Sequence, residues 1–202
     1  MTPTRLILWR HGQTLWNDQH RFQGSKADID LSPRGLEQAR AAAPALAHLA
    51  PDRLVTSPLR RAVDTGQAVA ELTGLTPSID PRLTEIDVGS WTGLAWEELT
   101  SHDPQAVAAL GRGEDVRYGG DGETPIEVGA RVGEALGDCA ALGGTSLIVS
   151  HGLALQSGVA NLLGWPTFAQ AQTLAVMSNC AWSILTRRGG ERWQLAVWNT
   201  SI

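Results

Sequence analysis

Three stretches of the sequence place a cationic or imidazole side chain directly after an apolar run. Arg5 to Trp9 lead into Arg10-His11-Gly12, Arg53 to Thr56 lead into Ser57-Pro58-Leu59-Arg60-Arg61, and Thr145 to Ser150 lead into His151-Gly152. Such runs are typical of strands in a buried parallel sheet. Ligands bind in the crevice outside the carboxyl ends of these strands. The three junctions therefore predict one site, in which His11 is a nucleophile for phosphate.

The residue types fit phosphate chemistry. Arginine offers a bidentate fork to phosphate oxygens and keeps its charge. A neutral imidazole attacks in line when a backbone carbonyl holds its other ring nitrogen and so fixes the tautomer. Phosphoryl transfer needs positioning and charge stabilisation more than covalent help. We therefore expect neither a metal nor another cofactor.

The elements that position these residues follow from local patterns. Helices are expected from Ser32-Pro33 to about Leu49, from Ser57-Pro58 to Thr73, over 126–142 and over 155–163. Pro44 should kink or break the first of them. Strands are expected at 5–9, 53–56, within 79–86 and at 145–150. Two more, at 181–186 and 192–198, form an antiparallel hairpin joined by residues 187–190. Residues 14–30 are predicted as a loop, and 87–124 as an irregular insertion that lies over the site and holds a short helix at 96–101.

Composition sets the broad class. The chain has 202 residues, which fits a single domain over 1–202, and 43% hydrophobic residues supply a sizeable core. The net charge of −5 argues against a nucleic-acid-binding protein. Cys139 and Cys180 form no disulfide framework, and no run is long enough to span a membrane. These features predict a cytoplasmic protein with no nucleic-acid or membrane partner, and they leave a homodimer open.

The same residues resemble a known family, the histidine phosphatase (phosphoglycerate mutase-like) superfamily in its first branch. The resemblance covers essentially the whole chain. It depends on the motifs at 8–14, 57–62, 83–89, 120–124 and 149–152. It implies a three-layer α/β/α sandwich whose central sheet is mostly parallel with an antiparallel edge strand.

The resemblance also implies roles for individual residues. His11 would accept the phosphoryl group, Glu85 would be the proton donor, and the group would be clamped by Arg10, Arg60 and His151. Asn17, Gln23 and Gly24 match positions that line the same pocket, and Gly152 stands where the second branch places its acid. Arg61 is interpreted as structural. A bound phosphate dianion would favour the protonated form of Glu85 by like-charge repulsion.

The sequence favours a phosphatase over a mutase. The family's mutases resemble one another in a longer insertion with a lysine after Thr-Gly-Leu and two adjacent arginines. Here Thr92-Gly93-Leu94 is followed by Ala95-Trp96, and Arg112 and Arg117 are separated. Either arginine could contact a substrate carboxylate, and Trp91 or Trp96 could wall the pocket.

The expected substrate is a small phosphorylated metabolite. The segments 177–182 and 192–199 look like actinobacterial members that dephosphorylate glucosyl-3-phosphoglycerate. Other sugar or glycerate phosphates, α-ribazole phosphate, cofactor-dependent phosphoglycerate mutation and a non-catalytic phospho-ligand-binding role stand as alternatives.

Overall fold

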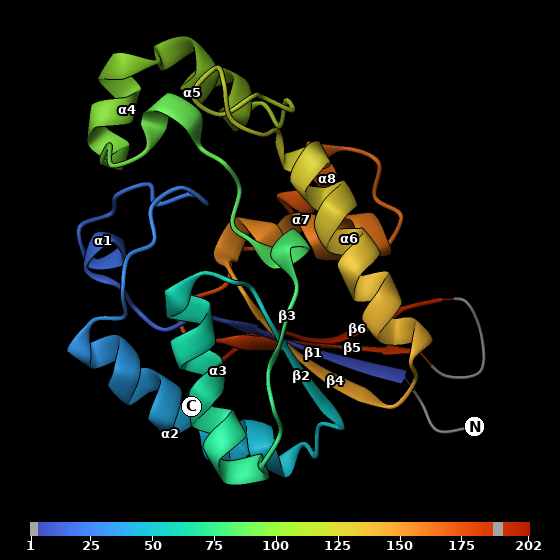
Figure 1. Ribbon diagram of the computed structural model, residues 1–202. Coiled ribbons are helices and arrows are strands. Elements are labelled where there is room, and N and C mark those ends of the chain that lie inside the picture. Colours follow the sequence, from blue (N-terminus) through green and yellow to red (C-terminus); the bar gives the residue numbers. More distant parts are fainter. Residues whose placement is uncertain (1–3, 188–191) are drawn as a thin grey trace.

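A six-stranded sheet forms the centre of the computed structural model, which describes residues 4–187 and 192–202 (Figure 1). The strand order is β3-β2-β4-β1-β5-β6. The strands are β1 (Thr4–Arg10), β2 (Arg53–Thr56), β3 (Ser78–Ile79), β4 (Thr145–Ser150), β5 (Trp182–Arg187) and β6 (Gln194–Thr200). The pairs β1–β4, β4–β2 and β2–β3 are parallel, whereas β5 runs antiparallel to β1 and to β6. The predicted mostly parallel sheet with an antiparallel edge hairpin is confirmed, although residues 188–190 of the predicted turn lie outside the described residues.

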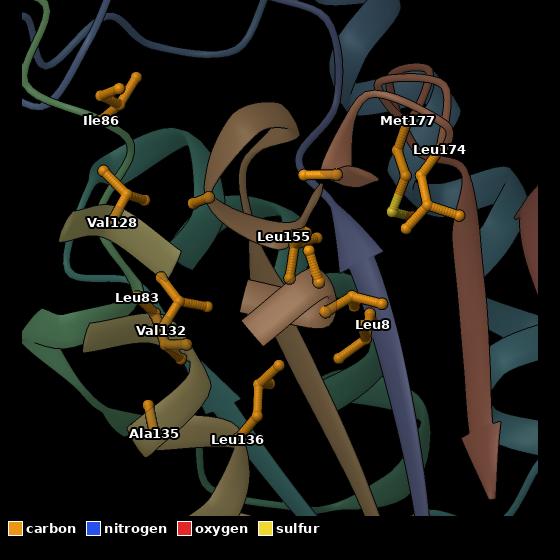
Figure 2. Close-up of a cluster of buried hydrophobic side chains, with 14 of the residues drawn as sticks. Leu8, Leu83, Ile86, Val128, Val132, Ala135, Leu136, Leu155, Leu174 and Met177 are labelled. Atoms are coloured by element: carbon orange, nitrogen blue, oxygen red, sulfur yellow. The ribbon is translucent and has the colours of Figure 1, made fainter. Parts of the chain in front are cut away.

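Helices cover both faces of this sheet. One face is covered by α2 (Pro33–His48) and α3 (Arg60–Thr73), the other by α6 (Pro125–Ala141) and α7 (Gly152–Leu162). Side chains of β1 alternate between the two faces: Ile7 and Trp9 pack in the core with α2 and α3, and Leu6 and Leu8 pack in the core with α6 and α7. Figure 2 shows Leu8 close to Leu155 in the second core. The predicted three-layer α/β/α sandwich is thus confirmed.

The region 87–124 contains more regular structure than expected. It holds a 3₁₀ turn (Gly89–Trp91), α4 (Trp96–His102) and α5 (Pro104–Gly111). The sequence indicated a helix near α4 but not α5, where Asp103 caps the helix through the N–H of Ala106. Two further short helices, α1 (Leu15–Asp18) and α8 (Phe168–Ala171), and a 3₁₀ turn at Pro81–Leu83 were also not predicted. The third strand, expected as a short strand or extended segment within 79–86, is Ser78–Ile79 and overlaps that range only at Ile79.

The expected kink or break at Pro44 does not end α2. The helix runs from Pro33 to His48 with Pro44 inside it, and its apolar stripe of Ala39, Ala43 and Leu46 is buried. The packing of this stripe on the sheet outweighs the hydrogen bond that proline cannot donate. In the described part of the chain, no helix has both the length and the apolar character needed to cross a bilayer.

We expect Pro44→Ala to stabilise the protein, because Pro44 is exposed and an alanine restores the missing helical hydrogen bond. The gain should be about 1–3 kcal/mol, which is the helix-interior cost of proline reduced by the entropy that alanine returns to the unfolded chain. Urea unfolding measures it. Pro33→Ala is the matched control: Pro33 occupies the first helical turn, where proline is tolerated. An unchanged or lower free energy of unfolding for Pro44→Ala would contradict this account.

Candidate active site

The ends of β1, β2 and β4 bring the three predicted junctions together. Arg10 pairs with Ser150 in the β1–β4 ladder, and the next residues, His11 and His151, have ring centroids 5.1 Å apart. The ladder continues beyond the strand, since the N–H of His11 donates to the carbonyl of Ser150 at 3.0 Å. Both imidazoles are buried. The predicted convergence of these junctions is therefore present in the structure.

A glycine behind His11 allows the chain to turn tightly against α2. A Cβ on Gly12 would lie 2.5 Å from the carbonyl oxygen of Gly35, and a Cβ on Gly35 would lie 2.1 Å from that of Gln13. Both distances are shorter than real Cβ contacts, so only glycine fits at these two positions. The Gly12 N–H is satisfied by Thr65 Oγ1 of α3 at 3.0 Å. The close approach of α2 therefore fixes the backbone that carries His11.

The His11 ring is oriented by a backbone carbonyl, as predicted. Its Nδ1 lies 2.7 Å from the Gly12 carbonyl oxygen, which makes Nδ1 the protonated nitrogen and leaves Nε2 unprotonated. Burial, and then the positive charges of Arg61 and Arg10, lower the pKa of His11 well below its ordinary value of 6.5. The imidazole is thus neutral at physiological pH, which is the state a nucleophile requires.

The two adjacent arginines of α3 occupy places opposite to those predicted. Arg61, interpreted from the sequence as structural, is fully buried, and its Nε donates to His151 Nδ1 at 3.3 Å. It also donates to the carbonyls of Gly24 and Ala27, both at 2.9 Å. Arg60, predicted to clamp the phosphoryl group, is 65% exposed and pairs with Asp30 at 3.2 Å. The expectation for Arg60 is therefore wrong in its geometry.

The reason for this exchange is the face that α3 turns toward the sheet. Its first residue is Arg60, and Ser57 does not cap it: Ser57 Oγ lies 2.8 Å from His151 Nε2 instead. From Arg60, the buried face of the helix comprises Arg61, Ala62, Thr65, Gly66, Val69 and Ala70. Arg61 therefore faces the strand ends, whereas Arg60 faces solvent.

Arg10 and Arg61 bring positive charge into the protein interior. Burial lowers the pKa of both, that of Arg61 to about 10. A guanidinium nevertheless keeps its charge at neutral pH. Arg10 donates to the carbonyl of Met177, and its Nε is buried with no hydrogen-bond partner in the described structure. Among residues 4–187 and 192–202, neither guanidinium forms an ion pair with a carboxylate. Because buried charges are normally paired, this arrangement indicates a binding site for an anion.

Glu85 reaches the same cavity from the segment that follows β3. Its Oε1 accepts hydrogen bonds from the N–H groups of Ile86 and Ala154, both at 2.9 Å. Its Oε2 has only a longer contact, 3.3 Å, from the N–H of Leu153. The carboxyl group therefore sits at the N-terminus of α7, where the helix dipole favours negative charge, with one oxygen firmly held and the other less engaged.

Arg10, His11, Arg61 and Glu85 line a cavity of about 630 Å³, whereas His151, predicted to clamp the phosphoryl group, lies fully buried behind it. Of the residues predicted to bind substrate, Asn17, Gln23, Gly24 and Gly152 line it. Arg112, Arg117 and Trp91 do not. Arg112 and Arg117 are exposed and pair with neighbouring Glu114 and Glu127 at 2.6 and 2.5 Å, and Trp91 is buried against Phe22 and Tyr118.

The remaining wall comes from residues that the sequence did not single out for this purpose. Besides Trp96, which the sequence offered as a wall residue, it includes Arg21, Phe22, Leu110, Tyr118, Gln156, Phe168, Gln172 and the segment 174–176. Among these wall residues, the sequence indicated only Trp96, an aromatic residue in the insertion beside Glu85. In the described ranges, no group of three or more His, Cys, Asp or Glu side chains is arranged to hold a metal ion.

Comparison with known proteins agrees with this geometry. The family model of the histidine phosphatase superfamily (branch 1) matches residues 6–201, and the chain belongs to this family. It is 38% identical to the glucosyl-3-phosphoglycerate phosphatase of Mycolicibacterium vanbaalenii, over all of this chain and 96% of that protein. It is 34% identical to a probable phosphoglycerate mutase, GpmB, of an Enterobacter species, over 88% of this chain and 82% of that one. Its fold matches a mycobacterial glucosyl-3-phosphoglycerate phosphatase in complex with VO3 with a TM-score of 0.89 and 36% identity, over 98% of this chain and all of the other.

The neutral histidines lead to a prediction for stability. Burial lowers the pKa of both His11 and His151 well below 6.5. As the pH falls, these two histidines therefore bind protons in the unfolded chain before they do so in the folded protein. Below about pH 6.5, each should reduce the free energy of unfolding by about 1.4 kcal/mol per pH unit until its folded-state pKa is reached.

Urea unfolding from about pH 8 to pH 5 tests this expectation, with His11→Gln and His48→Gln compared with the unsubstituted protein. His11→Gln should reduce the pH dependence. His48→Gln should leave it unchanged, because His48 is exposed on α2. Equal pH dependence in all three proteins would show that His11 is not held neutral by the fold.

Proposed function

We propose that the chain is a phosphomonoesterase that hydrolyses a small phosphorylated metabolite through a phosphohistidine at His11. The observation that carries this proposal is a fully buried guanidinium, Arg61, and a partly buried one, Arg10, neither with a carboxylate partner among the described residues, beside a neutral imidazole. A phosphate dianion supplies the missing negative charge. Phosphoryl transfer is catalysed chiefly by such positioning and charge stabilisation.

The proposed reaction has two steps. His11 Nε2 attacks phosphorus, the bond from phosphorus to the ester oxygen breaks, and Glu85 gives that oxygen a proton. A water molecule then attacks the phosphohistidine and loses its proton to Glu85, which releases inorganic phosphate and restores His11. Glu85 Oε2 is the oxygen assigned to the proton, because Oε1 is already held by two short hydrogen bonds from N–H groups.

Arg61 replaces Arg60 in this mechanism. Together, Arg10 and Arg61 surround the equatorial phosphoryl oxygens. His151 is held from both sides, by Arg61 at Nδ1 and by Ser57 at Nε2. Gly152 supports the arrangement, since a Cβ there would lie 3.3 Å from Arg10 Cζ and crowd the guanidinium. No step requires a metal or another cofactor.

The geometry favours hydrolysis over a mutase reaction. A mutase must hold a second anionic group, and the insertion arginines that could do so are bound to surface carboxylates outside the cavity. The cavity is nevertheless larger than a phosphoryl group needs, and it combines aromatic walls with Arg21, Gln156 and Gln172. A sugar attached to a phosphoglycerate fits this mixture, because aromatic rings pack against sugar faces while the amides of Gln156 and Gln172 meet hydroxyl groups. Together with the names of the mycobacterial relatives, this supports glucosyl-3-phosphoglycerate as the substrate.

Phosphate release from a panel of substrates tests the activity. The panel contains glucosyl-3-phosphoglycerate, α-ribazole phosphate, 3-phosphoglycerate with and without its bisphosphate cofactor, and an aryl phosphate. We expect hydrolysis that is insensitive to a chelator and absent in His11→Ala, with His102→Ala as the matched control at an exposed histidine. Activity that survives His11→Ala, or that needs added metal, would overturn the mechanism. Isomerisation of 3-phosphoglycerate that exceeds hydrolysis would instead favour the mutase.

The two arginines give a sharper test of the assignment. Arg61→Met should lower kcat/KM by about 100- to 1000-fold, the usual cost of removing one donor to the transition state. Arg60→Met should change it by no more than about threefold, because Arg60 forms only an exposed ion pair. Circular dichroism establishes that each variant is folded, and Arg61→Lys serves as a second, milder variant. The reverse order of effects would restore the role predicted for Arg60.

A further inference from the structure

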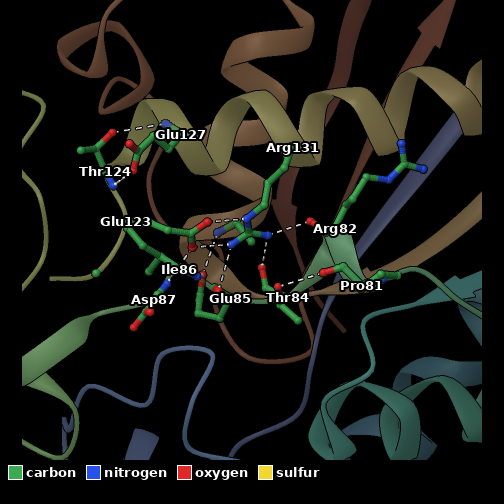
Figure 3. A network of polar contacts seen from close by, with 12 residues as sticks. Pro81, Arg82, Thr84, Glu85, Ile86, Asp87, Glu123, Thr124, Glu127 and Arg131 are labelled. Atoms are coloured by element: carbon green, nitrogen blue, oxygen red, sulfur yellow. Dashed lines mark hydrogen bonds and ion pairs between the residues drawn. The ribbon is translucent and has the colours of Figure 1, made fainter.

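Arg131 of α6 binds the backbone of the segment that carries Glu85 (Figure 3). Its Nη1 donates to the carbonyls of Arg82 and Thr84 at 2.7 and 2.8 Å, and its Nη2 donates to the carbonyl of Glu85 at 3.0 Å. These carbonyls belong to a short 3₁₀ turn and the irregular chain after it, which have no strand ladder of their own. Arg131 therefore supplies hydrogen bonds that regular structure does not provide there.

Glu123 completes this arrangement from the other side. Both of its oxygens pair with Arg131 at 2.8 Å, and Oε2 also accepts the N–H of Asp87 at 2.9 Å. The backbones of Glu123 and Asp87 are joined as well, at 2.8 Å. The side chains of both partners are largely covered, with 20% of Arg131 and 27% of Glu123 exposed. The segment from Arg82 to Asp87 is thus held at both ends by one bidentate pair.

This pair does not reach the proposed phosphate site. Neither Arg131 nor Glu123 lines the cavity, whereas Glu85 does. Ser150 Oγ, next to His151, holds the same segment through the carbonyl of Leu83 at 2.7 Å. The position of the Glu85 carboxyl group relative to His11 therefore depends on the backbone that Arg131 holds by hydrogen bonds.

We propose that Arg131, locked by Glu123, is a positioning residue that holds Glu85 at the distance at which it protonates the leaving oxygen. The inference rests on the proposed function, in which Glu85 is the acid. Its consequence is selective. Misplacing the acid harms esters whose leaving group needs a proton, and it spares esters whose leaving group departs as an anion.

The test compares two substrates, an alkyl phosphate such as glycerol phosphate and a nitrophenyl phosphate. For Arg131→Met we expect kcat/KM to fall by about 100-fold on the alkyl ester, the effect of a displacement of about 1 Å. On the nitrophenyl ester it should fall by no more than about threefold. Arg131→Lys and Glu123→Gln should show the same selectivity to a smaller degree, and they serve if Arg131→Met does not fold.

Arg53→Met is the matched control. Arg53 also donates from a partly buried position to a backbone carbonyl, that of Gly143 at 2.6 Å, but at the opposite end of the sheet. Arg53→Met should lower kcat/KM on both esters by the same factor or leave both unchanged. Equal losses on the two esters for all three variants of the Arg131–Glu123 pair would mean that the pair is merely structural, and would overturn the proposal.

Glu85→Gln separates this inference from the function on which it rests. It should show the same selectivity, and Arg131→Met should add little to it on the alkyl ester. If Glu85→Gln is selective and the Arg131 variants are not, the positioning role fails while the acid role stands. If Glu85→Gln itself shows no selectivity, the acid assignment fails and the positioning role fails with it.

Discussion

Burial of positive charge at the ends of parallel strands is the constraint on which the site depends. Arg10 and Arg61 remain charged although burial lowers the pKa of both, and neither has a carboxylate partner among the described residues. An isolated buried charge is costly, so the surrounding groups are those that limit the cost. His11 and His151 stay neutral, backbone carbonyls accept the guanidinium hydrogens, and Glu85 is the one carboxyl group that lines the cavity with them. In the proposed function, a phosphate dianion relieves the remaining deficit of negative charge.

The proposed nucleophile and the proposed acid are held by different parts of the fold. His11 follows a central strand, and the approach of α2 and the ladder to β4 fix its backbone. Glu85 follows the short edge strand β3 and depends on α6 and α7 for its position. A nucleophile needs a fixed line of attack, which a central strand provides. The proposed acid has no strand ladder to position it, so the hydrogen bonds from α6 and α7 take that part.

Most of the sheet, and the functional residues at its strand ends, could be predicted from the sequence, because both follow from local runs of apolar residues. The error at Arg60 and Arg61 arose from assigning the phosphate clamp to Arg60 by resemblance and interpreting Arg61, one step round the same helix, as structural. The spacing of Ala62, Thr65 and Val69 with Arg61 on one face, against Asp64 and Gln67 with Arg60 on the other, would have corrected it. Arg112 and Arg117 could not be placed in this way, since nearby glutamates bind them and only the tertiary structure shows which way they point.

The side chains that form the cavity wall come from different elements than the groups proposed to bind phosphate. The groups proposed to bind phosphate come from strand ends and the first turns of helices, whereas Leu110, Tyr118 and the segment 174–176 come from the insertion and from the chain between α8 and β5. These connecting segments carry none of the sheet ladder, so their side chains can change with little effect on the strands below. Substitution there alters which leaving group fits while the charge arrangement at His11 is kept. The fold therefore separates the chemistry of the phosphoryl group from the choice of the molecule that carries it.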